Sequence, residues 1–324
     1  MKKSIFLSFI LCLCLVACIP QQAMAQKQSR MEKLLRYLND NDADKWQKNR
    51  EKLDDETKAY YAEDLSLMDV LNDLWNGQSE QAATLYFGCY EKAAQNNFPS
   101  ICEGEKIPLS QIRDKADQSI INLLEASKDK IPFSRALLDS IHATEYPVDS
   151  AMLQRLQNIR EVALLEGMLK APTPIIYQTY VKEYPNGKFI AQVNASENVR
   201  LYQLVKTTPT PANFKAFFED PEMQKYYQDR GPRPYLAEVR TLYDDFLFQR
   251  IDSLKKEGNA TAIRQIIDDY KNTPYLATGA RTHLNDLEYL SEKADFELLK
   301  PAIVNSESLG LLQEFLKTHK YKEF

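Results

Sequence analysis

The feature that most constrains the fold is a helix-turn-helix pattern that occurs four times in the second half of the chain. Its first copy is the stretch Ile175–Ala195. There, Tyr177, Tyr180 and Val181 have the i, i+3, i+4 spacing of one face of a helix. A Tyr-Pro-Asn-Gly break follows, and both proline and Asn-Gly end helices. Because one helix pair cannot bury its own apolar face, the pattern predicts neighbours of the same kind.

The pattern has two parts, and each part returns at corresponding positions. The first helix of each copy carries apolar residues at i, i+3 and i+4, and three copies begin the second helix with an aromatic-aliphatic-alanine triplet. Twelve positions separate the two parts in the first and third copies, whereas the second copy is nine residues longer, which predicts an insertion at Glu222–Arg230. We expect the first-helix positions to form a seam on which successive pairs stack, with the triplets packed behind it. The seam positions are Tyr177, Phe214, Ile263 and Leu312, and the triplets begin at Phe189, Tyr235 and Tyr275.

The fourth copy reaches Phe324, the last residue given, before a second helix can form. We therefore expect an apolar edge that either folds back on the third pair or is capped by another chain. The polar positions between the seam residues, together with the inserted turn, are the surface expected to meet a partner.

The order of aromatic residue, helix, Tyr-Pro, small polar residue and triplet resembles the degenerate tetratricopeptide-type units of bacterial cell-envelope proteins of the Bacteroidota type. The resemblance covers Ala171–Phe324, and the stretch Gly77–Tyr86 is similar to the second helix of such a unit. The units are 37 to 49 residues long and lack the Trp-Leu-Gly-Tyr signature of the family. The resemblance implies an irregular α-solenoid of stacked helix pairs that acts as a scaffold or peptide-binding adaptor.

The region before the repeats also has the apolar spacing of helices. Its clearest example is Asp149–Leu169, where apolar residues recur every three or four positions. Only 9 glycines occur in 324 residues, which disfavours a chain of tight β-turns. The sequence therefore predicts an all-α protein with an N-terminal helical region over residues 26–169 and a helical-repeat region over residues 170–324.

The first 25 residues have the order of an export signal peptide. Lys2 and Lys3 precede an apolar run, Ser4–Cys18, and an A-x-A site stands immediately before Gln26. This order predicts cleavage before Gln26 and a periplasmic or secreted protein, with no transmembrane span in the mature chain. In the alternative, Leu15–Cys18 resembles a lipobox, which would make Cys18 a lipidated N-terminus and the protein an outer-membrane lipoprotein.

Two cysteines lie outside the signal region, Cys89 and Cys102. Their spacing matches no metal motif and no C-x-x-C redox motif. An even pair in a chain addressed to an oxidising compartment predicts a disulfide. Two unpaired buried thiols are the alternative.

The chain has a net negative charge, and its excess of acidic residues is concentrated in one stretch. Removal of the signal peptide changes the formal net charge from −5 to −7, which argues against nucleic acid as a partner. The stretch Glu51–Glu80 holds most of the local excess. We interpret it as a solvated helix surface, with a docking face for a basic partner or a divalent cation as the alternative.

Residues typical of catalysis or of metal binding are scarce and scattered. His142, His283 and His319 each stand alone in a helical context, and no phosphate loop, G-x-S-x-G or H-E-x-x-H motif occurs. The sequence therefore predicts no catalytic residue, no metal ligand and no cofactor.

The function predicted first is that of an exported cell-envelope scaffold that binds a protein or a peptide. The alternatives are an enzyme whose site is assembled from residues distant in sequence, and an outer-membrane lipoprotein assembly factor. A pocket of convergent polar groups with perturbed pKa values would favour the enzyme, whereas an extended groove would favour the scaffold.

Overall fold

The computed structural model describes residues 24–95, 109–257, 260–271, 281–303, 309–320 and 322–323. Their secondary structure is helical throughout, with no strand in these ranges, so the all-α prediction is confirmed. The chain divides into two compact units, Met1–Glu166 and Gly167–Phe324. The dividing point in the sequence falls within the helix Ser150–Lys170, three residues before the expected boundary. Within the described ranges, no helix is both long enough and apolar enough to cross a membrane.

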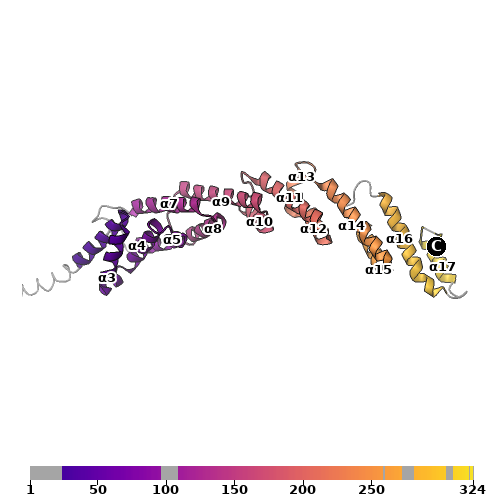
Figure 1. Ribbon diagram of the computed structural model, residues 1–324, viewed down its shortest axis with the longest axis horizontal. Coiled ribbons are helices and arrows are strands. Elements are labelled where there is room, and N and C mark those ends of the chain that lie inside the picture. The colour runs from indigo at the N-terminus through magenta and orange to yellow at the C-terminus, as the bar shows by residue number, and fades with distance from the viewer. Residues whose placement is uncertain are drawn as a thin grey trace, which may run out of the picture. The chain divides into compact units, whose positions relative to one another are not determined.

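The first unit is a set of helices around one apolar core (Figure 1). The α4 and α5 helices form its centre, since α4 packs along α5 and against α7, while α5 also contacts α8. Trp46, Leu71, Tyr86 and Phe87 are almost completely buried in this core. The helices of the first unit are residues 24–39, α2 (Ala43–Glu51), α3 (Asp55–Tyr60), α4 (Ala62–Trp75), α5 (Glu80–Gln95), α7 (Leu109–Ala126), α8 (Lys130–His142) and α9 (Ser150–Lys170), the last of which continues into the second unit.

The turn between α4 and α5 depends on a glycine. A Cβ atom at Gly77 would lie 2.8 Å from the carbonyl oxygen of Asp73, which is too close for any other residue without movement of the backbone. The Asp73 carbonyl accepts hydrogen bonds from the backbone N–H groups of Gly77 and Ser79, at 3.1 and 3.3 Å. Ala82 and Ala83, near the start of α5, are at most 4 % exposed. Small residues therefore permit the close approach of α4 and α5.

The second unit is a series of stacked helix pairs with the character of an α-solenoid (Figure 1). Its contacts run between helices that are close in chain order: α10 with α11, α11 with α12 and α14, α14 with α15, and α15 with α16. The helices of the second unit are α10 (Pro174–Glu183), α11 (Ile190–Thr207), α12 (Pro211–Phe218), α13 (Pro221–Gln228), α14 (Leu236–Lys256), α15 (Ala260–Lys271), α16 (Arg281–Leu299), the 3₁₀ turn η1 (Lys300–Ala302) and α17 (Leu309–Thr318).

The first two pairs have the same backbone hydrogen bonds where the second helix begins. The N–H of Ile190 donates to Gly187 and that of Leu236 donates to Arg233, both at 3.3 Å. One turn later, Val193 donates to the carbonyl of Phe189 as Val239 does to that of Tyr235. The triplet therefore marks a repeated pattern of backbone hydrogen bonds, although φ of its first residue is −111° at Phe189 and 65° at Tyr235.

The inserted turn of the second pair is itself helical. The expected insertion at Glu222–Arg230 corresponds closely to α13, whose N-cap Asp220 accepts a hydrogen bond from Met223 N at 2.8 Å. Gln224 then ties α13 back to the end of α12, because its side-chain amide donates to the carbonyl of Phe218 at 2.8 Å.

The last helix, α17, folds back on α16. The ring of Phe315, which is 5 % exposed, lies 5.6 Å from the ring of Phe296 on α16. His319 places Nε2 3.2 Å from Asp295 Oδ2, and Lys320 pairs with Glu288 at 3.5 Å. Of the two outcomes expected for this edge, the structure shows the fold-back, while Leu309 and Leu311 remain about half exposed.

Candidate functional site

A pocket of about 740 Å³ lies beside the inserted helix α13. It is formed by the end of α12, by α13, by the loop that follows it and by the first turns of α14. Lys225, Arg233 and Arg240 line this pocket together with apolar side chains such as Met223 and Leu236, and no acidic residue lines it. In a chain of net charge −5, this is a local concentration of positive charge.

Arg233 is fixed in this pocket by contacts on several sides. Its Nε donates to Asn198 Oδ1 at 2.6 Å, and its Nη1 donates to the carbonyl oxygen of Phe217. The guanidinium carbon also lies 3.9 Å from the centre of the Phe217 ring, within the range of a cation–π contact. Asn198, which is 1 % exposed on α11, donates in turn to the carbonyl of Pro234 at 3.2 Å.

Two guanidinium nitrogens of the pocket residues are buried without a hydrogen-bond partner in the described part of the chain. They are Nη2 of Arg233 and Nε of Arg240. Burial lowers the pKa of Arg233 from its ordinary value, and the nearby charge of Asp220 only partly opposes this. A buried cation with an unpaired N–H is costly, so an anionic group in the pocket would relieve that cost.

The loop between α13 and α14 contains two residues with positive φ. Gly231 has φ of 101° and Tyr235 has φ of 65°, which is uncommon for a residue with a side chain. The Tyr235 ring stacks on that of Tyr202 from α11, with centres 4.3 Å apart and planes 11° apart. Tyr202 is held by Lys206, whose Nζ donates to its hydroxyl at 3.1 Å, and by a bond to Glu238. These contacts hold Tyr235 in a backbone conformation that is unfavourable for a residue with a side chain.

The seam positions are buried to different degrees. Tyr177 and Phe214 are 3 % and 1 % exposed, whereas Leu312 is half-buried. Tyr177 donates to Asn194 Oδ1 on α11 at 2.9 Å, and Phe214 contacts Tyr243 and Phe246 on α14. These contacts join α10 to α11 and α12 to α14, the two helices of one pair in each case. That successive pairs stack on the seam positions stays a prediction. The side chain of Ile263 lies outside the described residues.

The second-helix triplets do not share one environment. Phe189 is half-buried, and its backbone N–H donates to the hydroxyl of Tyr180 at 3.1 Å. Tyr235 is 41 % exposed and packs on Tyr202, a residue of the preceding pair, instead of behind the seam of its own pair. Tyr275 lies outside the described residues.

The cysteine predictions fall partly outside the described residues. Cys89 is half-buried on α5, it forms no disulfide within the described residues, and its sulfur lies 3.5 Å from Ser66 Oγ. Cys102 and the lipidation alternative Cys18 are not among the described residues. The Cys89–Cys102 disulfide therefore stays a prediction.

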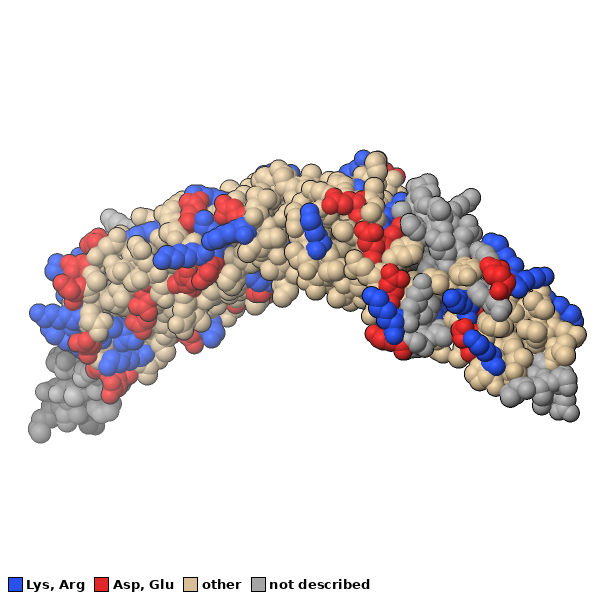
Figure 2. Space-filling view, turned by 45° about the vertical axis from the view of Figure 1, so that its right-hand side comes forward, with Lys and Arg blue, Asp and Glu red and all other residues tan. Residues whose placement is uncertain are grey.

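Much of the acidic stretch Glu51–Glu80 is used within the first unit. Arg50 forms a two-bond contact with Asp69 at 2.9 and 3.0 Å, and Asp54 caps α3 by accepting from Thr57 N at 2.8 Å. Within the described ranges, no group of three His, Cys, Asp or Glu side chains is arranged to hold a metal ion. On the face drawn in Figure 2, acidic and basic side chains are interspersed rather than separated into fields.

A second cluster of perturbed groups lies in the first unit. Tyr146 donates to Asp117 Oδ1 at 2.5 Å, and the hydroxyls of Tyr86 and Tyr146 are 3.4 Å apart. Burial raises the pKa of Asp117 to about 6 and also raises those of both tyrosines. Asp117 lines a pocket of about 490 Å³ together with Arg113 and Arg155. No motif in the sequence indicated this cluster, because its members are up to 60 positions apart.

The histidines remain dispersed, with one exception to their expected isolation. His319 contacts Asp295, which also pairs with Arg264, and its ring stacks on Phe315 with centres 4.0 Å apart. His142 is exposed at the end of α8, and the side chain of His283 lies outside the described residues. The His319 contacts join the end of α17 to α16, and Asp295 in turn joins α16 to α15, which is a packing role.

The pocket beside α13 is the site that these observations favour. Comparisons of the chain with protein-family models, with curated proteins and with solved structures found no match in any of the three. The fold and the site by themselves define the class: an all-α protein of stacked helix pairs with a cation-lined pocket in its second unit.

Proposed function

We propose that this protein is an exported binding scaffold of the cell envelope, and that the pocket beside α13 holds an acidic peptide segment of a protein partner. The observation that carries the proposal is the set of three cationic side chains around an apolar pocket without an acidic lining residue. Export rests on the signal-peptide pattern of the first 25 residues.

The chemistry of the pocket favours a carboxylate on an apolar peptide. A guanidinium and a carboxylate form short, charge-assisted hydrogen bonds, and the unpaired Nη2 of Arg233 and Nε of Arg240 are donors for such bonds. Leu236 and Pro232 offer apolar contacts for neighbouring side chains of the peptide. The volume of about 740 Å³ is in the range of ordinary ligand sites.

The test is a binding titration with short labelled peptides. Fluorescence anisotropy would compare a peptide of alternating Glu and Leu with a Lys-Leu peptide of the same length. We expect saturable binding of the acidic peptide only, and at least about tenfold weaker binding to Arg240→Ala and Lys225→Glu. Arg233 is unsuitable as the first variant, because its bonds to Asn198 and Phe217 also support the fold.

A matched control distinguishes the effect of the pocket on peptide binding from the effect of the net charge. Lys182→Glu makes the same change of charge as Lys225→Glu, at an exposed position of α10 outside the pocket. Equal losses in the two lysine variants would mean that only the net charge matters, and the proposed site would be wrong. Equal binding of acidic and basic peptides would also overturn the proposal.

The proposed export of the protein has a separate test. N-terminal mass spectrometry of the protein recovered from the envelope should find a chain that begins at Gln26. A diacylated Cys18 would instead make it an outer-membrane lipoprotein and would favour a role in lipoprotein assembly.

The second candidate function is an enzyme that uses the Asp117 cluster. The raised pKa of Asp117, its bond to Tyr146 and the adjacent arginines are features that general acid–base sites share. A panel of chromogenic ester, phosphate and glycoside substrates would test it. Turnover that Asp117→Asn abolishes would support the enzyme, whereas equal rates in both proteins would remove it.

A further inference from the structure

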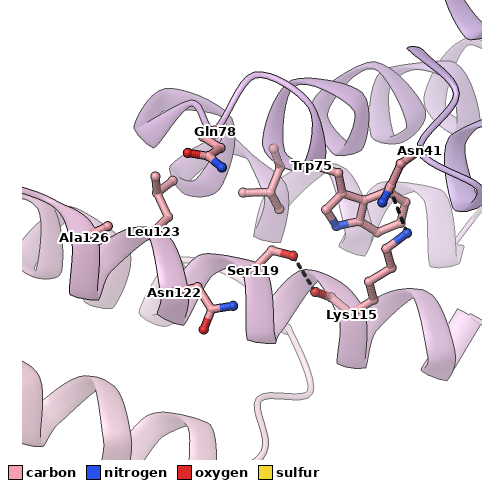
Figure 3. Close-up of a pocket in the computed structure, with 9 residues that line it drawn as sticks. Asn41, Trp75, Gln78, Lys115, Ser119, Asn122, Leu123 and Ala126 are labelled. Atoms are coloured by element: carbon pink, nitrogen blue, oxygen red, sulfur yellow. Dashed lines mark hydrogen bonds between the residues drawn. The ribbon is translucent and has the colours of Figure 1, made fainter.

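A pocket of about 220 Å³ in the first unit is built from three segments that are distant in sequence (Figure 3). The end of α4 contributes Leu74 and Trp75, the turn after it contributes Gln78, and the turn before α2 contributes Asn41. The facing side is α7, which contributes Lys115, Ser119, Asn122, Leu123 and Ala126.

Lys115 is the only charged residue of this lining, and its charge is already engaged. Its Nζ donates to the carbonyl of Asn39 at 2.8 Å and to Asn41 Oδ1 at 3.1 Å. It also lies 3.9 Å from the centre of the Trp75 ring, and burial lowers its pKa. Lys115 therefore holds the indole from one face, and the pocket offers neither a free cation nor a carboxylate to a ligand.

The indole N–H of Trp75 has no partner in the described part of the chain, although the atom is buried. Figure 3 shows this nitrogen on the side of the ring toward Ser119, away from the Lys115 amine. Buried donors are nearly always paired, so this one indicates an acceptor that is supplied from outside the chain. Ser119 Oγ donates to the carbonyl of Lys115 at 2.8 Å, which leaves its lone pairs as acceptors in the pocket.

Two amide side chains complete the polar lining. Asn122 accepts from Gln118 through Oδ1 at 2.7 Å, which leaves its NH₂ group as a donor. Gln78 follows Gly77 in the fixed turn after α4 and has φ of 48°, while Asn41 on the opposite rim has φ of 56°. Gln78 and Asn41, on opposite sides of the pocket, therefore both have a left-handed backbone conformation. For a residue with a side chain, this conformation costs free energy and is maintained by the surrounding structure.

We propose that this pocket binds a single neutral sugar ring. The free groups are all neutral, and they include a donor in Trp75, an acceptor in Ser119 and two amides. A sugar hydroxyl both donates and accepts, so it can pair with each of these groups. Leu74, Leu123 and Ala126 also line the pocket, and the apolar C–H face of a sugar ring complements such carbon surfaces. The volume suits one ring rather than a chain.

The test uses the fact that the chain contains only two tryptophans, Trp46 and Trp75. In the ¹⁵N-labelled full chain, each gives one indole N–H resonance, and Trp75→Phe assigns them. We expect glucose, galactose, mannose or N-acetylglucosamine to shift the Trp75 resonance saturably at about millimolar concentration. The Trp46 resonance should stay fixed, because Trp46 is 2 % exposed in the core and outside the pocket.

Matched variants and small-molecule controls decide the outcome. Asn122→Ala and Gln78→Ala should each weaken the binding at least about fivefold, whereas Gln47→Ala, an amide removed from an exposed site on α2, should leave it unchanged. The proposal is wrong if none of the four sugars shifts the Trp75 resonance saturably. It is also wrong if glycerol or glutamate shifts that resonance as strongly as the sugars do, or if the two amide variants bind as the unchanged chain does.

Discussion

Asp64, on the first turn of α4, is a carboxyl group that the fold buries without full compensation. It is 5 % exposed, and its Oδ1 has no hydrogen-bond partner within the described ranges. Burial raises its pKa from 3.8 to about 6. The folded protein therefore binds this proton more tightly than the unfolded chain does, and ionisation of Asp64 destabilises the fold.

This contribution has a defined pH window. The stabilisation from the protonated carboxyl is complete below pH 3.8 and is lost as the pH rises to about 6. Asp64→Asn should therefore raise the free energy of unfolding at pH 7.5 by up to about 3 kcal/mol, with little gain near pH 4. Urea denaturation at the two pH values measures the difference. Asp73→Asn, at an exposed site of the same helix, should show no such dependence, and a gain independent of pH at Asp64 would contradict the argument.

At the residue scale, the sequence predicts burial better than it predicts polar partners. Tyr177 and Phe214 are buried as their helical spacing indicates. The role of Arg233 could not be predicted, because it depends on Asn198, a residue 35 positions earlier on another helix. Likewise, the sequence gives Tyr235 the same position as the first residues of the other two triplets. Its left-handed backbone conformation and its stacking on Tyr202 appear only in the folded chain.

At the scale of single elements, α10 and α12 begin with the same device. Thr173 and Thr210 are N-caps whose hydroxyls accept from the backbone N–H three residues later, both at 3.3 Å, and a proline follows each of them. The Pro-Thr-Pro sequence at both places was a signal that could have been found beside the apolar pattern.

These caps lead to a prediction on stability. Thr173→Ala and Thr210→Ala should each lower the free energy of unfolding by about 1 kcal/mol, because an N–H at the helix start loses its acceptor. Chemical denaturation followed by circular dichroism measures the loss. Thr241→Ala, at an exposed interior position of α14, removes a hydroxyl that serves no cap, and should cost less. An equal loss at all three threonines would contradict a capping role.

At the scale of the whole molecule, the repeat spacing predicted the order of the helix pairs in the second unit, because stacking needs only recurring apolar faces. It predicted the position of the insertion but not its helical form, which depends on the Asp220 cap and on the bond from Gln224 to Phe218. The three pockets were not predicted, since each combines residues from separate turns of the chain.

Contacts between neighbouring helices should make stability local in the second unit. Phe315→Ala removes the main buried contact of α17 and should cost about 3 kcal/mol locally. Hydrogen exchange should accelerate in α16 and α17, while the amides of α10 and α11 remain protected. Leu316→Ala, at a position 36 % exposed, is the control. Uniform acceleration across all these helices would show that the unit unfolds as one block.

The insertion of α13 has a consequence for how such a protein can change. The backbone hydrogen bonds that begin the second helix are the same at Gly187–Val193, where no helix is inserted, and at Arg233–Val239, where one is. The residue before the second helix nevertheless differs in backbone conformation, with φ of −111° at Phe189 and of 65° at Tyr235. The turn therefore accommodates a whole inserted helix with the same hydrogen bonds and a different conformation at one residue. A change of sequence at that turn can therefore alter the surface beside α14 while the helix pairs on either side keep their sequence. Transplanting residues 220–232 into the turn after α10 would carry the pocket's rim to a second position on the same scaffold.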